Sequence, residues 1–280
     1  MLSYRHAFHA GNYADVLKHL VLSRTLDYLT QKSGPVCYID THAGAGGYSL
    51  VCSEAKKTGE FNDGIGLLWQ RKDLPAPLAE YRALVEQFNE GRALRNYPGS
   101  PWIARQLLRK QDRMELCELH PKDHPRLAAL FKGERRVNCY FEDGFKRSLA
   151  LVPPVERRGL VLIDPSYEIK DDYAKVVKHI KALHKRFATG TFALWYPVVD
   201  EQRVRTLEKA FVNSGMRNIE LYEVSLTEDH DQKGMTGSGM IVVNPPWTLK
   251  KEVREALDWF APLVSETGQP LYRVVQLVAE

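Results

Sequence analysis

The sequence predicts an α/β protein organised around a mostly parallel, doubly wound sheet. Short apolar runs alternate with segments of helical periodicity through most of the 280 residues, and strands separated by helices form parallel sheets. The most apolar run, residues 160–163, must end at Asp164, because Pro165 cannot donate to a strand ladder. The first run leads into the glycine-rich turn 41–47. Since ligands bind beyond the carboxyl ends of parallel strands, we expect Asp164 and this turn to face a crevice.

With 44% apolar residues the chain can bury a full core, as one large or two small domains, and we expect one cytoplasmic domain over residues 1–280. No run of about 18 apolar residues exists and the start lacks an apolar signal core, so we expect neither a membrane span nor a secretory leader. The four cysteines show no Cys-x-x-Cys spacing, which favours reduced, buried thiols. A net charge of +4 permits a nucleic-acid partner without requiring one.

The chain begins with an arm, a helix and a strand. Residues 1–12 carry aromatic and cationic side chains without periodicity, which is typical of an arm. Asn12 is a suitable N-cap for a helix over residues 13–30. Residues 36–40 form the first strand, and the glycine-rich turn that follows lets the backbone approach a nucleotide. Such turns are also common in ordinary loops, so the later strands must decide its role.

Residues 50–96 interrupt this alternation and are expected to form a small helical insertion, with helices around residues 66–70 and 77–89. The cations of this segment are Lys56, Lys57, Arg71, Lys72, Arg82, Arg92 and Arg95. Each of them singly is most simply a solvated surface residue. As a group near a site they are candidates for binding RNA phosphates, and Arg71 and Lys72 are the pair we select for that role.

From Ser100, an N-cap followed by Pro101, helices and strands alternate regularly. Helices are predicted over residues 101–109, 122–132, 144–151, 171–187 and 201–213. Strands are predicted over residues 114–119, 137–141, 160–163 and 191–196. The last two strands, 218–225 and 240–243, are joined without a helix. They therefore form a hairpin, in which one strand runs antiparallel to the sheet.

Polar side chains follow four of the predicted parallel strands. They are Asp40 with His42, Glu118, Asp143 and Asp164. Because the carboxyl ends of parallel strands meet at one edge, we expect these side chains to share a site, although each acid alone suits a solvated surface or a helix N-cap. The order of glycine-rich turn and acids resembles the S-adenosylmethionine methyltransferase fold. In that fold the acid after the second strand holds the ribose hydroxyls, and the acid after the third strand lies near the adenine amino group.

Two segments resemble the signature of amino-group methyltransferases, (Asp/Asn/Ser)-Pro-Pro-(Tyr/Phe). Asp164-Pro-Ser-Tyr167 departs from the signature at Ser166, whereas Asn244-Pro-Pro-Trp247 has both prolines. Asp-Pro before an aromatic residue also makes an ordinary turn. We assign the signature to Asp164, because Asn244 closes a hairpin strand whose end should lie at the opposite edge of the sheet.

Longer motifs extend the resemblance over nearly the whole chain. They are Leu2-Ser-Tyr-Arg-His-Ala-Phe-His-Ala-Gly-Asn12, Asp15-Val-Leu-Lys-His19, Thr41-His-Ala-Gly-Ala-Gly46, Tyr97-Pro-Gly-Ser-Pro101, Phe187-Ala-Thr-Gly-Thr191, Trp195-Tyr-Pro-Val-Val199 and Gly239-Met-Ile-Val-Val-Asn-Pro-Pro-Trp247. By these motifs the chain resembles the bacterial 23S ribosomal RNA adenine-N6 methyltransferase J family.

This resemblance implies a Rossmann-like class I methyltransferase fold, S-adenosyl-L-methionine as the cofactor and 23S ribosomal RNA as the partner, without a metal or a membrane. The cofactor contacts that it implies are Lys18, His19, His42, Ser100, Glu118, Asp143, Gly144 and Asp164. It also implies Asp164 as the catalytic acid and Tyr4 as a contact to the RNA, with Ser166 standing where the family has proline. We expect a monomer.

A methyltransferase of this kind must activate the adenine amino nitrogen, whose lone pair is delocalised into the ring. Asp164 is expected to accept one amino hydrogen and the Pro165 carbonyl the other, which favours a tetrahedral nitrogen in line with the methyl donor. Tyr167 is expected to stack on the extruded base.

Other functions stay open at this point. Adenine in DNA is an alternative target. The histidines that suggest a metal-dependent nuclease, acting in the catabolism of external DNA, are His6, His9, His19, His42 and His120. No His-x-Glu or Cys-x-x-Cys motif supports that reading. A third alternative is an inactive fold retained as an RNA-binding module, which the departure at Ser166 suggests.

Overall fold

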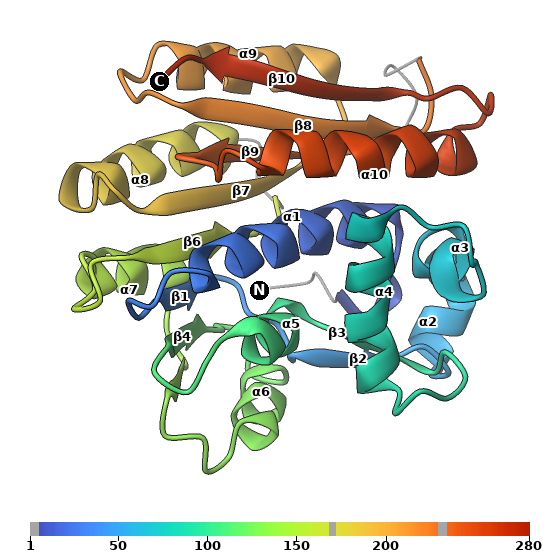
Figure 1. Ribbon diagram of the computed structural model, residues 1–280, viewed down its shortest axis with the longest axis horizontal. Coiled ribbons are helices and arrows are strands. Elements are labelled where there is room, and N and C mark those ends of the chain that lie inside the picture. The colour runs from blue at the N-terminus through green and yellow to red at the C-terminus, as the bar shows by residue number, and fades with distance from the viewer. Residues whose placement is uncertain (1–5, 168–171, 229–233) are drawn as a thin grey trace.

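The computed structural model describes residues 6–167, 172–228 and 234–280, and over these residues eight strands form one sheet in the order β10-β8-β9-β7-β6-β1-β4-β5 (Figure 1). The strands are β1 (Cys37–Asp40), β4 (Arg113–Cys117), β5 (Val137–Tyr140), β6 (Gly159–Ile163), β7 (Thr191–Val198), β8 (Ile219–Ser225), β9 (Gly237–Val243) and β10 (Tyr272–Val278). This mostly parallel sheet confirms the predicted fold class.

The strand directions differ from the prediction at the end of the chain. β1 pairs in parallel with β4 and β6, and β9 runs antiparallel to both β7 and β8, as the predicted hairpin requires. β10 also runs antiparallel, on the outer side of β8. The expectation of one antiparallel strand was therefore wrong, because β10 was missed. Only Val274 of this edge strand is buried, so its sequence lacks the continuous apolar run of the inner strands.

Helices cover both faces of the sheet, so inner strands are apolar on both sides. In β6, Leu160 and Leu162 belong to the core that contains α1, whereas Val161 and Ile163 belong to the core that contains α8. The helices around the sheet are α1 (Tyr13–Thr30), α5 (Ser100–Leu107), α6 (His124–Leu130), α7 (Gly144–Leu151), α8 (Asp172–Arg186), α9 (Glu201–Val212) and α10 (Leu249–Val264). Figure 1 shows α1 and α10 in front of the sheet and α7, α8 and α9 behind it. No helix in the described part of the chain combines the length and apolar character that a membrane span requires.

The insertion is bracketed by a two-stranded ribbon that the sequence did not reveal. β2 (Gly47–Ser49) pairs antiparallel with β3 (Asn96–Pro98), directly after the glycine-rich turn. Between these strands lie α2 (Ser53–Thr58), the 3₁₀ helix η2 (Glu60–Asp63), α3 (Ile65–Trp69) and α4 (Ala76–Phe88). The Ile65 N–H donates to the Gly11 carbonyl at 2.9 Å, and a Cβ on Gly64 would lie 2.1 Å from the same oxygen. The insertion is thus packed against the segment that precedes α1.

That segment is less arm-like than expected. It contains the 3₁₀ helix η1 (His6–Phe8), and residues 10–12 are buried. The Asn12 side chain accepts from the Asp15 N–H at 3.0 Å, which confirms it as the N-cap of α1, and donates to Glu60 at 3.0 Å. Contacts with the insertion therefore order the residues that a lack of periodicity had suggested were an arm. Tyr4 lies outside the described residues.

The four cysteines are free, as expected, but the expected burial holds for only two of them. Cys37 and Cys117 are buried, whereas Cys52 and Cys139 are half-buried. Burial raises the pKa of Cys37 and of Cys117 to about 12, so both thiols stay protonated near neutral pH.

Candidate active site

Two cavities open at the carboxyl ends of the central strands. β1 lies between β4 and β6, where the order of strands reverses, and open α/β sheets bind ligands at such a switch point. The first cavity, which we call the strand-edge cavity, has a volume of about 480 Å³. The second, which we call the aromatic cavity, has a volume of about 830 Å³ and lies between the end of β6, the start of α1 and the insertion.

The strand-edge cavity collects all of the residues predicted to contact the cofactor. These are Lys18, His19, His42, Ser100, Glu118, Asp143, Gly144 and Asp164, and Pro165 joins them. They come from α1, the glycine-rich turn, α5 and the ends of β4, β5 and β6. Segments up to 146 residues apart therefore meet at one edge, as Lys18 and Asp164 do.

The glycine-rich turn forms one wall of this cavity. Gly44 and Gly46 have φ values of +60° and +75°, a left-handed conformation that favours glycine. The Gly44 N–H donates to the Glu118 carboxylate at 2.7 Å, and the His120 N–H donates to its other oxygen at 2.5 Å. Burial raises the pKa of Glu118, although these two amide donors oppose the rise. The turn and the end of β4 are thereby locked together.

Gly144 and Asp143, at the start of α7, also line this cavity. A Cβ on Gly144 would lie 1.8 Å from the Thr41 carbonyl oxygen, so only glycine allows α7 to approach the first turn. The Asp143 carboxylate accepts from the N–H groups of Phe145 and Lys146 at 2.8 and 3.3 Å. This N-cap holds the Asp143 side chain at the cavity.

Four histidines, His6, His19, His42 and His120, line the cavity, and two of them were predicted to contact the cofactor. His19 is buried, with Nδ1 2.8 Å from the Tyr97 hydroxyl, and burial lowers the pKa of His19 to about 3. Its ring is therefore neutral at physiological pH. The His42 ring stands edge-on to Phe145 at 5.0 Å between centroids, and its Nδ1 lies 2.8 Å from the Thr41 hydroxyl.

Asp40 corrects one expectation, because it lines neither cavity. It is fully buried and accepts from the hydroxyls of Tyr38 and Ser100, each at 2.7 Å, and from the His42 N–H at 3.2 Å. Burial raises the pKa of Asp40 to about 6. The Asp40 side chain points into the protein because of its position in β1. It therefore orients Ser100 and does not face a ligand.

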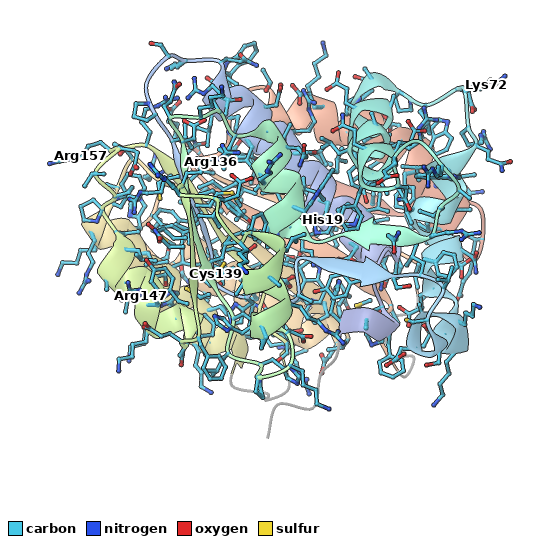
Figure 2. All side chains as sticks on the ribbon, turned by 90° about the horizontal axis from the view of Figure 1, so that it is seen from below. His19, Lys72, Arg136, Cys139, Arg147 and Arg157 are labelled. Carbon is cyan, nitrogen blue, oxygen red and sulfur yellow. The ribbon has the colours of Figure 1, made fainter. Side chains whose placement is uncertain are left out.

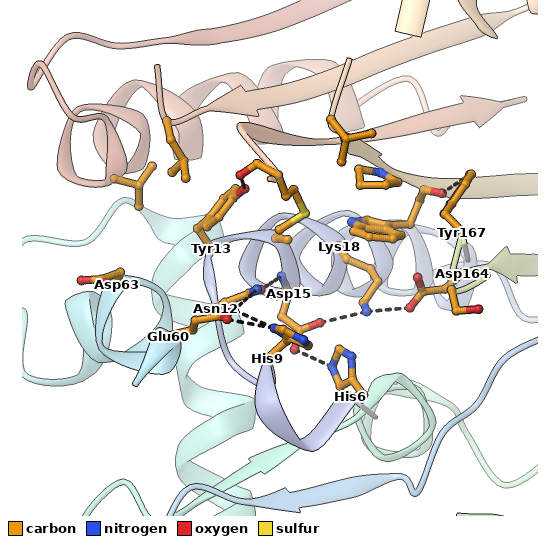
Figure 3. A pocket seen from close by; sticks show the side chains of 18 of the residues that line it. His6, His9, Asn12, Tyr13, Asp15, Lys18, Glu60, Asp63, Asp164 and Tyr167 are labelled. Atoms are coloured by element: carbon orange, nitrogen blue, oxygen red, sulfur yellow. Dashed lines mark hydrogen bonds and ion pairs between the residues drawn. The ribbon is translucent and has the colours of Figure 1, made fainter. Parts of the chain in front are cut away.

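Asp164 ends a chain of charged groups that runs along α1 (Figure 3). Its carboxylate lies 2.6 Å from Lys18 Nζ, which also lies 2.8 Å from Asp15. Asp15 in turn lies 2.9 Å from His6 Nε2. Burial alone would lower the pKa of Lys18, but the carboxylates of Asp15 and Asp164 raise it well above its usual value. Lys18 therefore stays charged and orients Asp164.

The aromatic cavity adjoins the strand-edge cavity at Asp164. Both cavities are lined by His6, Lys18, Asp164, Ser166 and Trp195. A ligand in either cavity can therefore reach Asp164, which is the geometry a group transfer between two ligands requires.

Tyr167 lies in the wall of the aromatic cavity beside two other aromatic side chains. Its φ is +49°, and its hydroxyl donates to the Trp195 carbonyl at 2.8 Å. Its ring centroid lies 4.7 Å from that of Tyr173 and 5.9 Å from that of Trp195. The wall is thus an aromatic surface of the kind on which a base stacks.

Arg71 and Lys72 line neither cavity. Figure 2 shows Lys72 at the periphery of the molecule, whereas His19 lies in its interior. The Arg71 guanidinium lies 2.6 Å from Asp73 and 4.9 Å from the Trp259 ring centroid. A phosphate contact from Arg71 would therefore have to compete with Asp73.

The histidines that the structure describes are not arranged as a metal site would require. His6 contacts Asp15, whereas His9 contacts Glu60 at 2.9 Å, so two different carboxylates hold this pair. Within residues 6–167, 172–228 and 234–280, no group of three or more histidine, cysteine or acidic residues is arranged to hold a metal ion.

Comparisons with known proteins agree on the family. The family model RsmJ, described as "Ribosomal RNA large subunit methyltransferase D, RlmJ", matches residues 33–277. The chain is 51% identical over its full length to ribosomal RNA large subunit methyltransferase J of Escherichia coli K12, and 48% identical to the protein of that name from Haemophilus influenzae, each covered completely. The chain belongs to the RlmJ family of ribosomal RNA large subunit methyltransferases. It is accordingly an S-adenosylmethionine-dependent methyltransferase.

Solved structures agree with this assignment. A protein of Legionella pneumophila strain Philadelphia 1 is 36% identical, with a TM-score of 0.88 over 96% of this chain and 98% of that one. A spermidine synthase of Corynebacterium glutamicum, 11% identical over 96% of this chain and 76% of its own, has a TM-score of 0.51. The second likeness shows the fold alone. The family model and the two ribosomal RNA large subunit methyltransferases J confirm the predicted family, and the observed sheet agrees with the predicted Rossmann-like fold.

Some lining residues were not selected from the sequence. Trp195 lies within β7, the parallel strand next to β6, directly after Leu194, which pairs with Ile163 at the end of β6. His6 and Asp15 had no comparable signal, because their role depends on the bend between η1 and α1.

Proposed function

We propose that the chain transfers the methyl group of S-adenosylmethionine to the N6 amino group of an adenine in 23S ribosomal RNA. The observation that carries this proposal is the position of Asp164, which lines both cavities. A cofactor in the strand-edge cavity and a base in the aromatic cavity would meet at this carboxylate. The names of the two relatives, both ribosomal RNA large subunit methyltransferases, support RNA as the substrate class.

The residues of the strand-edge cavity suit the cofactor. Glu118 and Asp143 offer carboxylate oxygens to hydroxyl and amino groups, and the rings of His42 and Phe145 offer flat contact surfaces. Gly44 has no side chain, so its backbone could lie close to the cofactor. When bound, S-adenosylmethionine supplies an electrophilic methyl group. Lys18, His19, Ser100, Gly144 and Asp164 complete the proposed set of cofactor contacts.

Asp164 and Pro165 would act on the amino group. The Lys18 ammonium holds the Asp164 carboxylate at the junction of the cavities, where it can accept one amino hydrogen. The Pro165 carbonyl is the proposed acceptor of the other hydrogen. Together these acceptors would favour a tetrahedral nitrogen, and the proton that leaves it would pass to Asp164 or to water.

Further residues would hold the RNA. Tyr167 would stack on the target base, since its ring belongs to the aromatic wall. Arg71 and Lys72 would bind phosphates on the surface of the insertion, with Arg71 exchanging Asp73 for the phosphate. Tyr4 is the proposed RNA contact outside the described residues. A ribosomal RNA substrate also fits the cytoplasmic location expected from the sequence, and a monomer is sufficient because one chain supplies both cavities.

Methyl transfer to isolated nucleic acids tests the proposal. Purified protein and radiolabelled S-adenosylmethionine are incubated with 23S ribosomal RNA from cells that lack this gene, and with DNA in parallel. We expect label in RNA as N6-methyladenosine and none in DNA. Label in DNA alone, or in no substrate, would contradict the proposed function.

A further inference from the structure

The aromatic cavity is larger than one extruded base requires. Its volume of about 830 Å³ is in the upper part of the range of roughly 300–1,000 Å³ for pockets that enclose a whole drug-sized ligand. A purine base is much smaller than such a ligand. The cavity therefore has room for a second group beside the target adenine.

Figure 3 shows that the cavity extends from Asp164 and Tyr167 to the insertion, with Asp15 and Lys18 between its two ends. We call the part remote from Asp164 the insertion end. Its lining residues are Tyr13, Glu60, Asp63, Leu226, Met235, Val264 and Glu266.

Four separate segments build the apolar walls of the insertion end. The Tyr13 hydroxyl donates to the Met235 carbonyl at 3.4 Å, which joins the start of α1 to the segment before β9. The Glu266 N–H donates to the Leu226 carbonyl at 2.8 Å, which joins the segments after α10 and β8. Burial raises the pKa of Tyr13 well above its usual value, so this ring stays neutral. Aromatic and apolar walls of this kind accept the π-face of a nucleobase.

Three carboxylates lie at the insertion end, and among the described residues two of them have no histidine partner of the kind that Glu60 has in His9. Glu60 is engaged by His9 at 2.9 Å and by Asn12 at 3.0 Å, whereas Asp63 and Glu266 are exposed carboxylates at the rim. Carboxylates repel a phosphate and accept hydrogen bonds from amino groups. Adenine, cytosine and guanine each present an exocyclic amino group, but uracil presents two carbonyls and one N–H. The occupant should therefore be a base that carries an amino group.

We infer that the insertion end binds the base of a nucleotide next to the target adenine, and that it favours adenine, cytosine or guanine over uracil. This inference rests on the proposed function, since it names a second feature of the same substrate. Both ends belong to one cavity, so two bases bound there must lie close together in the RNA. The second base therefore belongs to the nucleotide before or after the target adenine.

Short RNA hairpins test the inference with the full-length protein. Each hairpin carries the target adenosine in its loop, and the nucleotide before or after it is G, A, C, U or an abasic residue. At one of these two positions we expect the abasic residue to raise KM about tenfold with little change in kcat, because a stacked base contributes to binding rather than to chemistry. Uracil should fall between the abasic residue and cytosine. KM values that agree within about twofold at both positions would overturn the inference.

Variants of the rim test the role of the carboxylates. The double variant Asp63→Asn, Glu266→Gln should reduce the KM difference between the uracil and cytosine hairpins by at least about half. Glu255→Gln is the matched control, since Glu255 is an exposed acid of α10 that lines neither cavity. An unchanged difference in the double variant would contradict the preference for amino groups.

Binding measurements separate this inference from the proposed function. The same hairpins, labelled with a fluorophore, are titrated with protein and followed by anisotropy. Graded affinities without methyl transfer would support the insertion end as a base site and contradict the proposed function. Equal affinities for all hairpins would overturn the inference, even if every hairpin is methylated.

Discussion

Two similar motifs lie at opposite edges of the same sheet. Asp164-Pro-Ser-Tyr167 follows β6, a parallel strand, and lines both cavities, whereas Asn244-Pro-Pro-Trp247 follows the antiparallel strand β9. By its letters, the second motif fits the signature of amino-group methyltransferases better. The comparison teaches that the direction of a strand, and not the letters that follow it, decides whether a motif reaches the site.

The second motif has a structural function of its own. Asn244 has a φ of +54°, and its side-chain amide donates to the carbonyls of Ala188 and Gly190 at 2.8 Å each. These carbonyls precede β7, so Asn244 closes the edge at which the parallel strands begin. Trp247 is 81% exposed and lines neither cavity. The motif therefore ends a strand and joins it to α10, since its prolines cannot donate to a strand ladder.

The largest expected effect separates the two motifs directly. Asp164→Ala should reduce kcat by about 10²–10⁴-fold, because the amino group loses its charged acceptor. Asn244→Ala should leave kcat unchanged and lower the free energy of unfolding by about 1–2 kcal/mol, because two backbone carbonyls lose a donor. Methyl-transfer kinetics and urea unfolding measure the two quantities on both variants. An Asn244→Ala enzyme as impaired as Asp164→Ala would break the comparison.

The next effect concerns Asp40, the buried acid that ends the strand beside that of Asp164. The folded pKa of Asp40 is about 6 and its ordinary value 3.8, so its stabilising contribution is fully present below about pH 4 and is lost as the pH rises through 6. At 1.36 kcal/mol for each pKa unit, the parent should lose roughly 3 kcal/mol relative to Asp40→Asn between pH 4 and pH 7. Urea unfolding at each pH measures this difference. A constant difference would mean that burial does not suppress ionisation of Asp40.

Asp143 should have a smaller effect, confined to the cofactor. Asp143→Ala is expected to weaken S-adenosylmethionine binding by about 1–3 kcal/mol, because buried donors of the ligand lose their acceptor. Asp143→Asn keeps a side chain that caps α7 and so separates the loss of charge from the loss of the cap. Calorimetry measures the dissociation constants, with Glu142→Ala as the control outside both cavities. Equal constants for the parent and both Asp143 variants would remove this carboxylate from the cofactor site.

The smallest effect concerns the residue by which the first motif departs from the family pattern. Ser166→Pro should preserve or raise activity. A proline ring lowers the entropy cost of ordering the turn by about 0.4–1 kcal/mol, and it removes none of the proposed acceptors. Single-turnover methyl transfer compares the variant with the parent. A parent that is inactive until this substitution is made would show that the chain is a decayed methyltransferase.

Much of the fold and of the candidate cofactor site was predictable because both depend on local patterns. An apolar run that stops at Asp164-Pro165 defines a buried parallel strand and its end, and successive strands of this kind bring their ends to one edge. For the same reason Glu118 and Asp143 were found at the cavity without knowledge of their contacts, whereas Gly144 came from the family resemblance. Family motifs added Lys18 and His19, whose helical spacing alone did not assign them to a ligand.

Only the tertiary structure decided which of these groups turn toward a ligand and which turn inward. Asp40 follows the same rule as Asp164, but its register directs it to Tyr38 and Ser100. The ion pair between Lys18 and Asp164 joins residues 146 positions apart, and the aromatic cavity depends on the packing of the insertion against α1. Sequence patterns report the direction and burial of one element at a time. Cavities and buried charge pairs are formed between elements, so their shape depends on packing that no single stretch of sequence contains.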